Sequence, residues 1–313
     1  MRTHLPTDRR RPGARLAPWA ALAAVTLALT GCAGAADGAD GAAPGSGGGD
    51  VADDDVPADT PVLQVEQGGG FVMPGYDFMS VPYLTVYGDG RAIVPGPQIM
   101  IYPGPALPNL QTHDLSADDV AALLDSAREA GLLAEGLDYG QPPVADVPTT
   151  FVTLTAGGTT YVHEVAALGF ADGTDAGDAG EGLEPMEPAD TLSADQLEAR
   201  QALATFLAEA SELVNEAPEG GPLELDRFAI QARPTDDPMI GGIPEGGETL
   251  PWPLGVALDG ASECTLVEGA EAEALAEALA DANQATVWDQ SGTTYAVWVR
   301  PLLPGEPGCA DLR

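Results

Sequence analysis

The chain has 313 residues, with 12 basic and 49 acidic side chains and a formal net charge of −37 at pH 7. Nucleic-acid phosphates demand a basic protein face, so this charge excludes binding to DNA or RNA. The same charge repels an anionic membrane surface and favours a cationic or cell-envelope partner.

Residues 1–31 have the pattern of an export signal. Five arginines and one aspartate lie within the first fifteen residues, and the run from Leu16 to Leu29 is apolar and uncharged. That run is shorter than the roughly 20 apolar residues that cross a bilayer, so we expect a cleaved signal and not a permanent span.

The signal ends in Leu29-Thr30-Gly31-Cys32, a branched residue and two small residues before a cysteine. This pattern resembles the lipobox of bacterial lipoproteins. The resemblance implies that diacylglycerol is attached to the Cys32 thiol and that cleavage makes Cys32 the first residue. It also implies anchorage at the outer face of the cell membrane, because two acyl chains anchor stably where one is marginal. An ordinary signal peptide with an incidental cysteine is the alternative.

Residues 32–60 continue as an acidic segment of small residues. From residue 33 to 60 there are seven aspartates, no basic residue and no aromatic residue. Such a composition buries too little apolar surface to offset the entropy of ordering, so we expect a disordered tether. A tether of this length spans roughly 30 Å, which would hold the folded part clear of the lipid headgroups.

Beyond the tether, strand patterns alternate with helical ones. Aromatic and β-branched runs around glycine turns predict hairpins, and apolar residues at helical spacing behind a capping serine predict helices. The expected elements, in chain order, are a hairpin at 81–94, a helix from Ser116, a hairpin at 149–165, a helix from Ser193, a strand at 228–232, a helix at 270–282 and a hairpin at 286–300.

These elements predict an α+β fold, with mainly antiparallel hairpins packed against about three helices. The stretch 171–190 is acidic and poor in apolar residues. We interpret it as a loop or linker between a subdomain at 61–170 and a second one at 191–313. The two halves are alike in outline without a residue-level repeat, so one domain and two similar subdomains both remain open.

Four short motifs lie between residues 82 and 168. They are Tyr-Gly-Asp-Gly-Arg at 87–91, Leu-Ser at 115–116, Gly-Leu-Leu at 131–133 and Asp-x-Pro-Thr-Thr at 146–150. Together they resemble a domain of unknown function found in secreted bacterial lipoproteins. The resemblance implies no activity and supplies no catalytic residue.

The sequence assigns no catalytic residues. Nucleophilic catalysis needs a base beside the nucleophile, and the mature chain has two histidines, His113 and His163, and no Gly-x-Ser-x-Gly motif. His163 alternates with Tyr161 and Val165 along a predicted strand, so we expect a packed or half-exposed histidine and not a catalytic one. The His163-Glu164 pair lacks the second histidine of a zincin helix.

No metal or cofactor site is predicted. Asp172, Asp175, Asp178 and Glu181 recur every three residues, whereas a calcium-binding EF-hand loop needs ligands at alternate positions and a glutamate at its twelfth. The cysteines lack the CxxC spacing of a zinc ribbon. A calcium-responsive module remains an alternative interpretation of the acidic stretch.

Cys264 and Cys309 are the two thiols that remain once Cys32 is lipidated. An extracytoplasmic compartment permits their oxidation, so we predict a Cys264–Cys309 disulfide. Two buried free cysteines that lie far apart are the alternative.

Several aromatic residues lie in segments rich in glycine and proline. Trp252 stands between two prolines, and Phe71, Tyr76 and Phe78 lie on the approach to the first hairpin. These rings either line a groove for a peptide or glycan or cover the edges of the core. We expect a non-enzymatic binding or interaction module at the cell envelope. The alternative is an envelope hydrolase whose carboxylates converge only in the fold.

Overall fold

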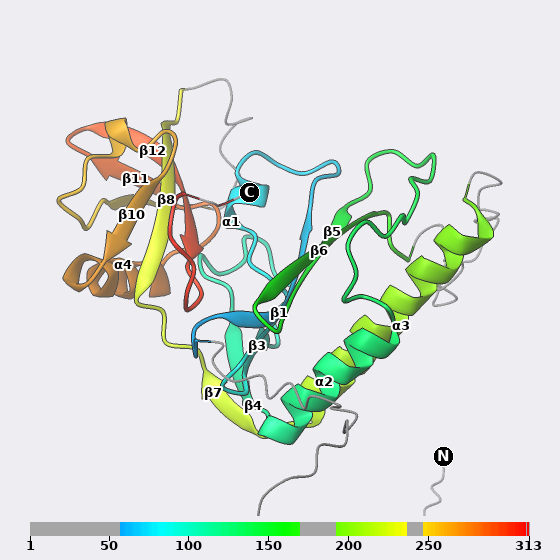
Figure 1. The fold of residues 1–313 in the computed structure, drawn as a ribbon. Helices are drawn as coiled ribbons and strands as arrows, with labels where there is room; N and C mark the ends of the chain where they lie inside the picture. Colours follow the sequence, from blue (N-terminus) through cyan, green and yellow to red (C-terminus); the bar gives the residue numbers. More distant parts are fainter. Residues whose placement is uncertain (1–56, 170–191, 237–246, 311, 313) are drawn as a thin grey trace, which may run out of the picture. The chain divides into compact units, whose positions relative to one another are not determined.

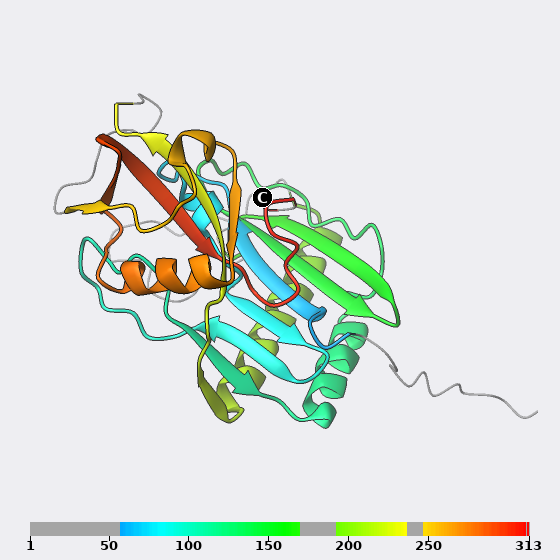
Figure 2. The same ribbon diagram turned by 90° about the vertical axis from the view of Figure 1, so that its left-hand side faces the viewer.

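The computed structural model describes residues 57–169, 192–236, 247–310 and 312. These residues form four helices and twelve strands, and the strands make two sheets in which antiparallel pairing dominates. The predicted α+β class is therefore confirmed (Figures 1 and 2). All of the described residues belong to one compact unit that spans Asp50–Arg313.

The first sheet has seven strands in the order β6-β5-β1-β2-β3-β4-β7, and all neighbours are antiparallel. The strands are β1 Pro61–Gly68, β2 Leu84–Tyr87, β3 Arg91–Pro95, β4 Leu110–Asp114, β5 Thr149–Ala156, β6 Thr159–Ala166 and β7 Glu219–Pro222. Both predicted hairpins of this part, β2–β3 and β5–β6, are present. Gly90 turns the first hairpin at a φ of 91°, and a Cβ there would lie 2.3 Å from the Leu115 carbonyl oxygen. Only glycine fits this corner.

Helices α2 (Ala117–Glu129) and α3 (Ala194–Glu216) lie along one face of the first sheet (Figure 1). Each begins with the predicted capping serine. Ser116 and Asp119 form a reciprocal capping box, as do Ser193 and Gln196, which satisfies backbone N–H groups at each helix start. The apolar faces of both helices pack with β1, β2 and β5 in one buried cluster. A short helix, α1 (Tyr76–Met79), follows β1.

The second sheet has five strands in the order β10-β8-β12-β11-β9. Its elements are β8 Arg227–Pro234, β9 Thr249–Pro251, the 3-10 helix η2 Leu258–Gly260, β10 Thr265–Glu268, helix α4 Ala270–Ala280, β11 Val287–Gln290 and β12 Thr293–Pro301. Only the β9–β11 pair is parallel. The inner residues of α4 and of the sheet form a second buried cluster.

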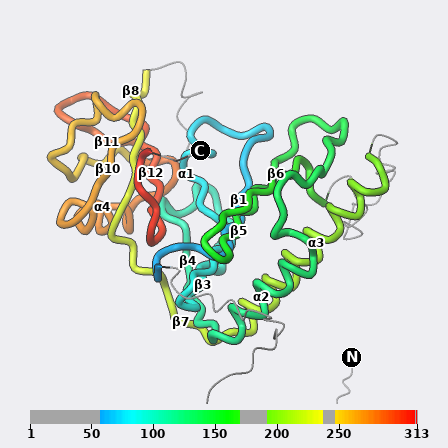
Figure 3. The backbone as a smooth tube through the Cα atoms, in the orientation of Figure 1, coloured from blue at the N-terminus to red at the C-terminus, as the bar shows by residue number. Residues whose placement is uncertain are grey.

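The division between the sheets differs from the predicted division at 171–190. Helix α3 and strand β7 pack with the first sheet, whereas the sequence placed them in the second subdomain. The chain changes sheets between Pro222 and Arg227, and Figure 3 traces this passage from β7 into β8. The reason is that the apolar face of α3 packs against strands that come earlier in the chain. The order of the elements in the sequence does not show this packing.

A smaller buried cluster joins the first sheet to the segment after β12. Tyr87, Ile93 and Leu110 from the first sheet meet Leu303, which follows β12. The Tyr87 hydroxyl also donates a hydrogen bond to the Pro304 carbonyl oxygen at 3.0 Å. The segment after β12 is therefore fastened to the first sheet.

Residues 57–60, which composition assigned to the tether, belong to the folded body instead. The Asp59 carboxylate accepts a hydrogen bond from Arg91 Nη2 at 2.8 Å. The Asp59 carbonyl oxygen also packs so closely on Gly305 that a Cβ there would lie 1.9 Å away. These long-range contacts order the segment, and composition does not reveal them. The rest of the predicted tether lies outside the described residues.

Candidate functional site

The pairing of β1 with β5 builds a small platform of side chains on one face of the first sheet. Val65 and Val152 point into the core that α2 and α3 complete, so their neighbours along each strand point to the opposite face. On that face the register places Gln64 opposite Thr153 and Glu66 opposite Phe151, and Gly68 lies opposite Thr149. These six residues are called the β1–β5 platform.

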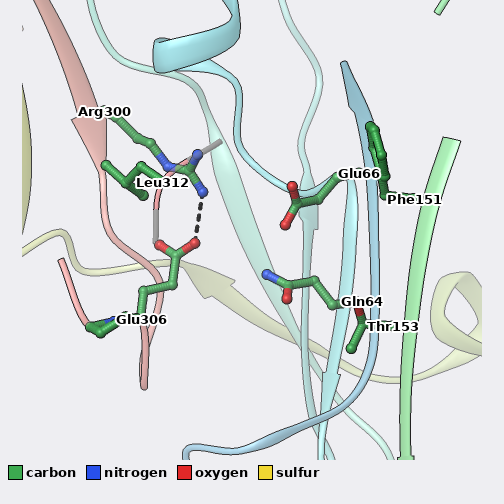
Figure 4. A pocket seen from close by; sticks show the side chains of 8 residues that line it. Gln64, Glu66, Phe151, Thr153, Arg300, Glu306 and Leu312 are labelled. Carbon is green, nitrogen blue, oxygen red and sulfur yellow. Dashed lines mark hydrogen bonds and ion pairs between the residues drawn. The ribbon is translucent and has the colours of Figure 1, made fainter. Parts of the chain in front are cut away.

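The segment that follows β12 faces this platform across a cleft (Figure 4). One hollow of about 200 Å³ lies between Gln64, Glu66, Phe151 and Thr153 on the platform and Arg300, Glu306 and Leu312 on the other side. A second hollow of about 210 Å³ includes Thr149, Asp77 and Ser80. Both hollows are lined by Glu66, Phe151 and Arg300, so they are neighbours, and together they are called the sheet cleft.

Arg300 is the most deeply buried charged group of the sheet cleft, with 4% of its surface exposed. Its Nη2 atom donates to Glu306 Oε1 at 2.7 Å, and Glu306 Oε2 accepts the Leu303 backbone N–H at 2.6 Å. The Arg300 Nε atom is buried and has no hydrogen-bond partner among the described residues. The charge of this guanidinium is therefore balanced, while its hydrogen-bonding capacity is only partly used.

The predicted Cys264–Cys309 disulfide is present, with the two Cα atoms 5.8 Å apart. This distance is usual for a disulfide. Cys309 lies between Pro307 and Leu312, which both line the sheet cleft, and Cys264 precedes the first residue of β10. The bond therefore ties one wall of the cleft to the second sheet.

Neither His113 nor His163 lines the sheet cleft. His163 is buried on the inner face of β6, which is the packed one of the two predicted environments. Its Nε2 atom lies 2.9 Å from the Leu132 carbonyl oxygen and its Nδ1 atom lies 2.9 Å from the Tyr139 hydroxyl. Because a carbonyl only accepts, Nε2 carries the proton and Nδ1 accepts from Tyr139. Burial lowers the pKa of His163. His113 Nδ1 approaches the Ala217 carbonyl oxygen at 3.2 Å.

The aromatic candidates separate into two groups. Trp252 packs edge-on against Trp288, with ring centroids 5.4 Å apart, and Phe78 is also buried. These two cover core edges. Phe71 and Tyr76 are 90% and 51% exposed.

Other predicted residues lie outside the part of the chain that the structure describes. They are Cys32 and the acidic residues Asp172, Asp175, Asp178 and Glu181. Within the described ranges, no group of three or more histidine, cysteine, aspartate or glutamate side chains is arranged to hold a metal ion. No helix in these ranges combines the length and apolar character that crossing a bilayer requires.

Sequence reasoning missed the residues of the sheet cleft. Strand β1 was not predicted, although Gln64 and Glu66 alternate with the apolar Leu63 and Val65, which is the pattern of a half-buried strand. That signal was available. The approach of Arg300 and Glu306 to β1 depends on tertiary packing and had no signal in the sequence.

No family model, curated protein or solved structure matches this chain. The resemblance of residues 82–168 to a lipoprotein domain therefore stays a prediction. The proposals for this protein rest on the residues of its own chain alone.

Proposed function

We propose that this protein is a membrane-anchored extracytoplasmic lipoprotein and that its folded part is a non-enzymatic binding module of the cell envelope. Residues 1–31 supply the export signal and Cys32 the lipid attachment point, in this proposal. The acidic segment after Cys32 links the lipid to the folded body. The sheet cleft is the ligand-binding site of the folded part.

The observation that carries the binding role is the incomplete hydrogen bonding of Arg300. Buried donors in native proteins are nearly always paired, and each exception calls for a physical explanation. Among the described residues, Arg300 Nε is one of four such exceptions, and Arg300 lines a hollow. A ligand oxygen in the sheet cleft, placed after a small shift of the guanidinium, would supply the missing acceptor.

The anchoring half of the proposal is tested by replacing Cys32 with serine in the full chain and growing the cells with labelled fatty acid. The wild-type protein should take up the label and the Cys32→Ser variant should not, because the thiol is the acylation site. A Cys264→Ser/Cys309→Ser double variant is the matched control and should still be labelled. Label on the Cys32→Ser variant would contradict the proposal.

A further inference from the structure

We propose that the loop between β3 and β4 docks on the surface of the lipid bilayer that holds the anchor. This inference rests on the proposed lipid attachment at Cys32 and is independent of the sheet cleft. It follows from the exposure of apolar side chains in the loop, from the absence of charge around them, and from the reach of the chain that precedes the folded body.

Four large apolar side chains lie exposed in a row within this loop. The exposed fraction is 63% for Ile99, 98% for Met100, 60% for Ile101 and 66% for Tyr102. These four residues are called the apolar tip. Single exposed apolar residues are common on protein surfaces, whereas a contiguous run of large ones marks a contact surface for a membrane or a partner.

The body fastens the loop on both sides of the apolar tip. On one side, the Gly96 N–H donates to the Asn109 carbonyl oxygen and Asn109 Nδ2 donates to the Pro97 carbonyl oxygen, both at 2.8 Å. On the other side, the Gln284 N–H donates to the carbonyl oxygen of the buried Gly104 at 2.9 Å, where the loop passes helix α4 (Figure 2). The ends of the loop are therefore held by the body while the side chains of the tip stay open to a second surface.

The surroundings of the apolar tip in the sequence are uncharged. No aspartate, glutamate, lysine or arginine occurs between Arg91 and Asp114, which makes this the longest uncharged stretch after Cys32 in a chain of net charge −37. Asn109 and Gln284, which fasten the loop, are uncharged as well. An uncharged apolar surface offers nothing to a cationic partner, whereas it suits a lipid interface. Charges further away than about 8 Å are largely screened at physiological salt.

The chain before the folded body lets the apolar tip reach the bilayer. Between Cys32 and residue 57 there are 24 residues, which could span at most roughly 80 Å. A folded body of this size has a radius of gyration of only about 18 Å, so a tip on any of its faces can meet the bilayer that holds the lipid. The lipid also keeps the tip at a high effective concentration near that bilayer, so a contact too weak to hold a free protein suffices as a second attachment.

The apolar tip enters only the interfacial layer of the bilayer. An irregular backbone leaves polar groups unpaired, which the hydrocarbon core does not tolerate. The Ile101 N–H donates to the Ile99 carbonyl oxygen at 3.0 Å, which satisfies one of these groups. The isoleucine and methionine side chains would reach the boundary between headgroups and acyl chains, and Tyr102 would keep its hydroxyl among the headgroups, where tyrosine is enriched.

The test places a fluorescent probe beside the apolar tip of the full-length lipoprotein in phosphatidylcholine vesicles. Gln98→Cys supplies the thiol for the dye, because Cys264 and Cys309 are bonded to each other and Cys32 carries the lipid in this proposal. Nitroxide groups on the acyl chains should quench the dye, more strongly when they lie near the headgroups than when they lie deep in the bilayer. A dye at Glu212→Cys, an exposed site on helix α3, should keep its fluorescence.

The residues are tested by adding Ile99→Ser/Met100→Ser/Ile101→Ser to the protein with the probe at residue 98. All three side chains are at least 60% exposed, so the fold should be retained, which a thermal melt verifies. Each buried apolar side chain favours the inserted state by about tenfold or more, so the quenching should fall to the level of the α3 probe. Val162→Ser, which removes an aliphatic side chain that is 57% exposed on β6, is the matched control and should leave the quenching unchanged.

The contrary results are distinct. Protein that floats with the vesicles while the probe at residue 98 stays unquenched would overturn the docking of the apolar tip and leave the lipid anchor in place. Quenching that survives the triple substitution, or that requires anionic lipid, would overturn it too. A blue shift that grows with the number of protein molecules per vesicle, without quenching by the nitroxides, would assign the tip to a second copy of the chain and overturn its docking on lipid. Protein that does not float with the vesicles would contradict both the docking and the anchor.

Discussion

Arg300 on β12 and Glu306 in the following segment form a nearly buried ion pair, with Nη2 and Oε1 2.7 Å apart. Removing one partner of such a pair leaves an uncompensated buried charge, which typically costs about 3–5 kcal/mol. We predict that Glu306→Ala lowers the free energy of unfolding by about that amount, as measured by urea denaturation.

A surface ion pair of the same kind provides the comparison. Arg227 Nε and Glu268 Oε1 are 2.8 Å apart, but their side chains are 29% and 51% exposed. Because exposed pairs contribute about 0–1 kcal/mol, Glu268→Ala should have a much smaller effect. If the two variants lose the same free energy of unfolding, burial does not make the loss of the Arg300–Glu306 pair more costly than the loss of an exposed pair.

The disulfide closes a loop of 45 residues. On the chain-entropy model, a loop of this length stabilises the native state by about 4 kcal/mol. We predict that the Cys264→Ser/Cys309→Ser variant loses stability on this scale in urea denaturation. Amide exchange should also accelerate around Glu306 and Gly308, because the wall of the sheet cleft loses its covalent attachment. Unchanged exchange in this segment would show that other contacts hold the wall.

His163 should make stability depend on pH. Burial lowers its pKa in the folded state, while the unfolded chain keeps a value near 6.5. The unfolded state therefore binds the proton more tightly, so the contribution of His163 is complete above about pH 6.5 and is lost as the pH falls through the folded-state pKa. Burial raises the pKa of its neighbour Tyr139 to about 12, so Tyr139 does not titrate in this range.

The measurement compares the melting temperature of the wild type with that of His163→Gln at pH 7.5 and pH 5. Acidic groups titrate in both proteins. The difference between their changes in melting temperature therefore reports the contribution of His163. We expect the wild type to lose more stability than the variant over this interval. If the melting temperatures of the wild type and the variant fall by the same amount, His163 does not contribute to the pH dependence of stability.

Local signals in the sequence were sufficient for much of the fold. Ser116 and Ser193 begin their helices as capping residues, and glycine turns join the predicted hairpins, because caps and turns depend on neighbouring residues. Strands β4, β7, β9 and β10 escaped prediction. They have three to five residues each, too few for a periodic pattern to emerge.

Much less of the candidate site could be predicted from the sequence. Cys264 and Cys309 were paired correctly because the predicted lipidation of Cys32 left no other thiol as a partner. Gln64, Thr153 and Arg300 come from three strands separated by long stretches of chain, and nothing local marks them as neighbours. The hydrogen bond from Tyr87 to Pro304, which fastens the segment after β12 to the first sheet, is likewise a long-range contact without a local signal.

The most direct test of membrane anchoring, on which the proposed location depends, is the mass of the N-terminal peptide of the mature protein. The protein would be purified from the membrane fraction of cells that express the full chain, then digested and measured by mass spectrometry. The proposal predicts a peptide that begins at Cys32 and carries a diacylglyceryl group on the cysteine sulfur. A mature chain that begins after Cys32, or one in which Cys32 carries no lipid, would contradict it.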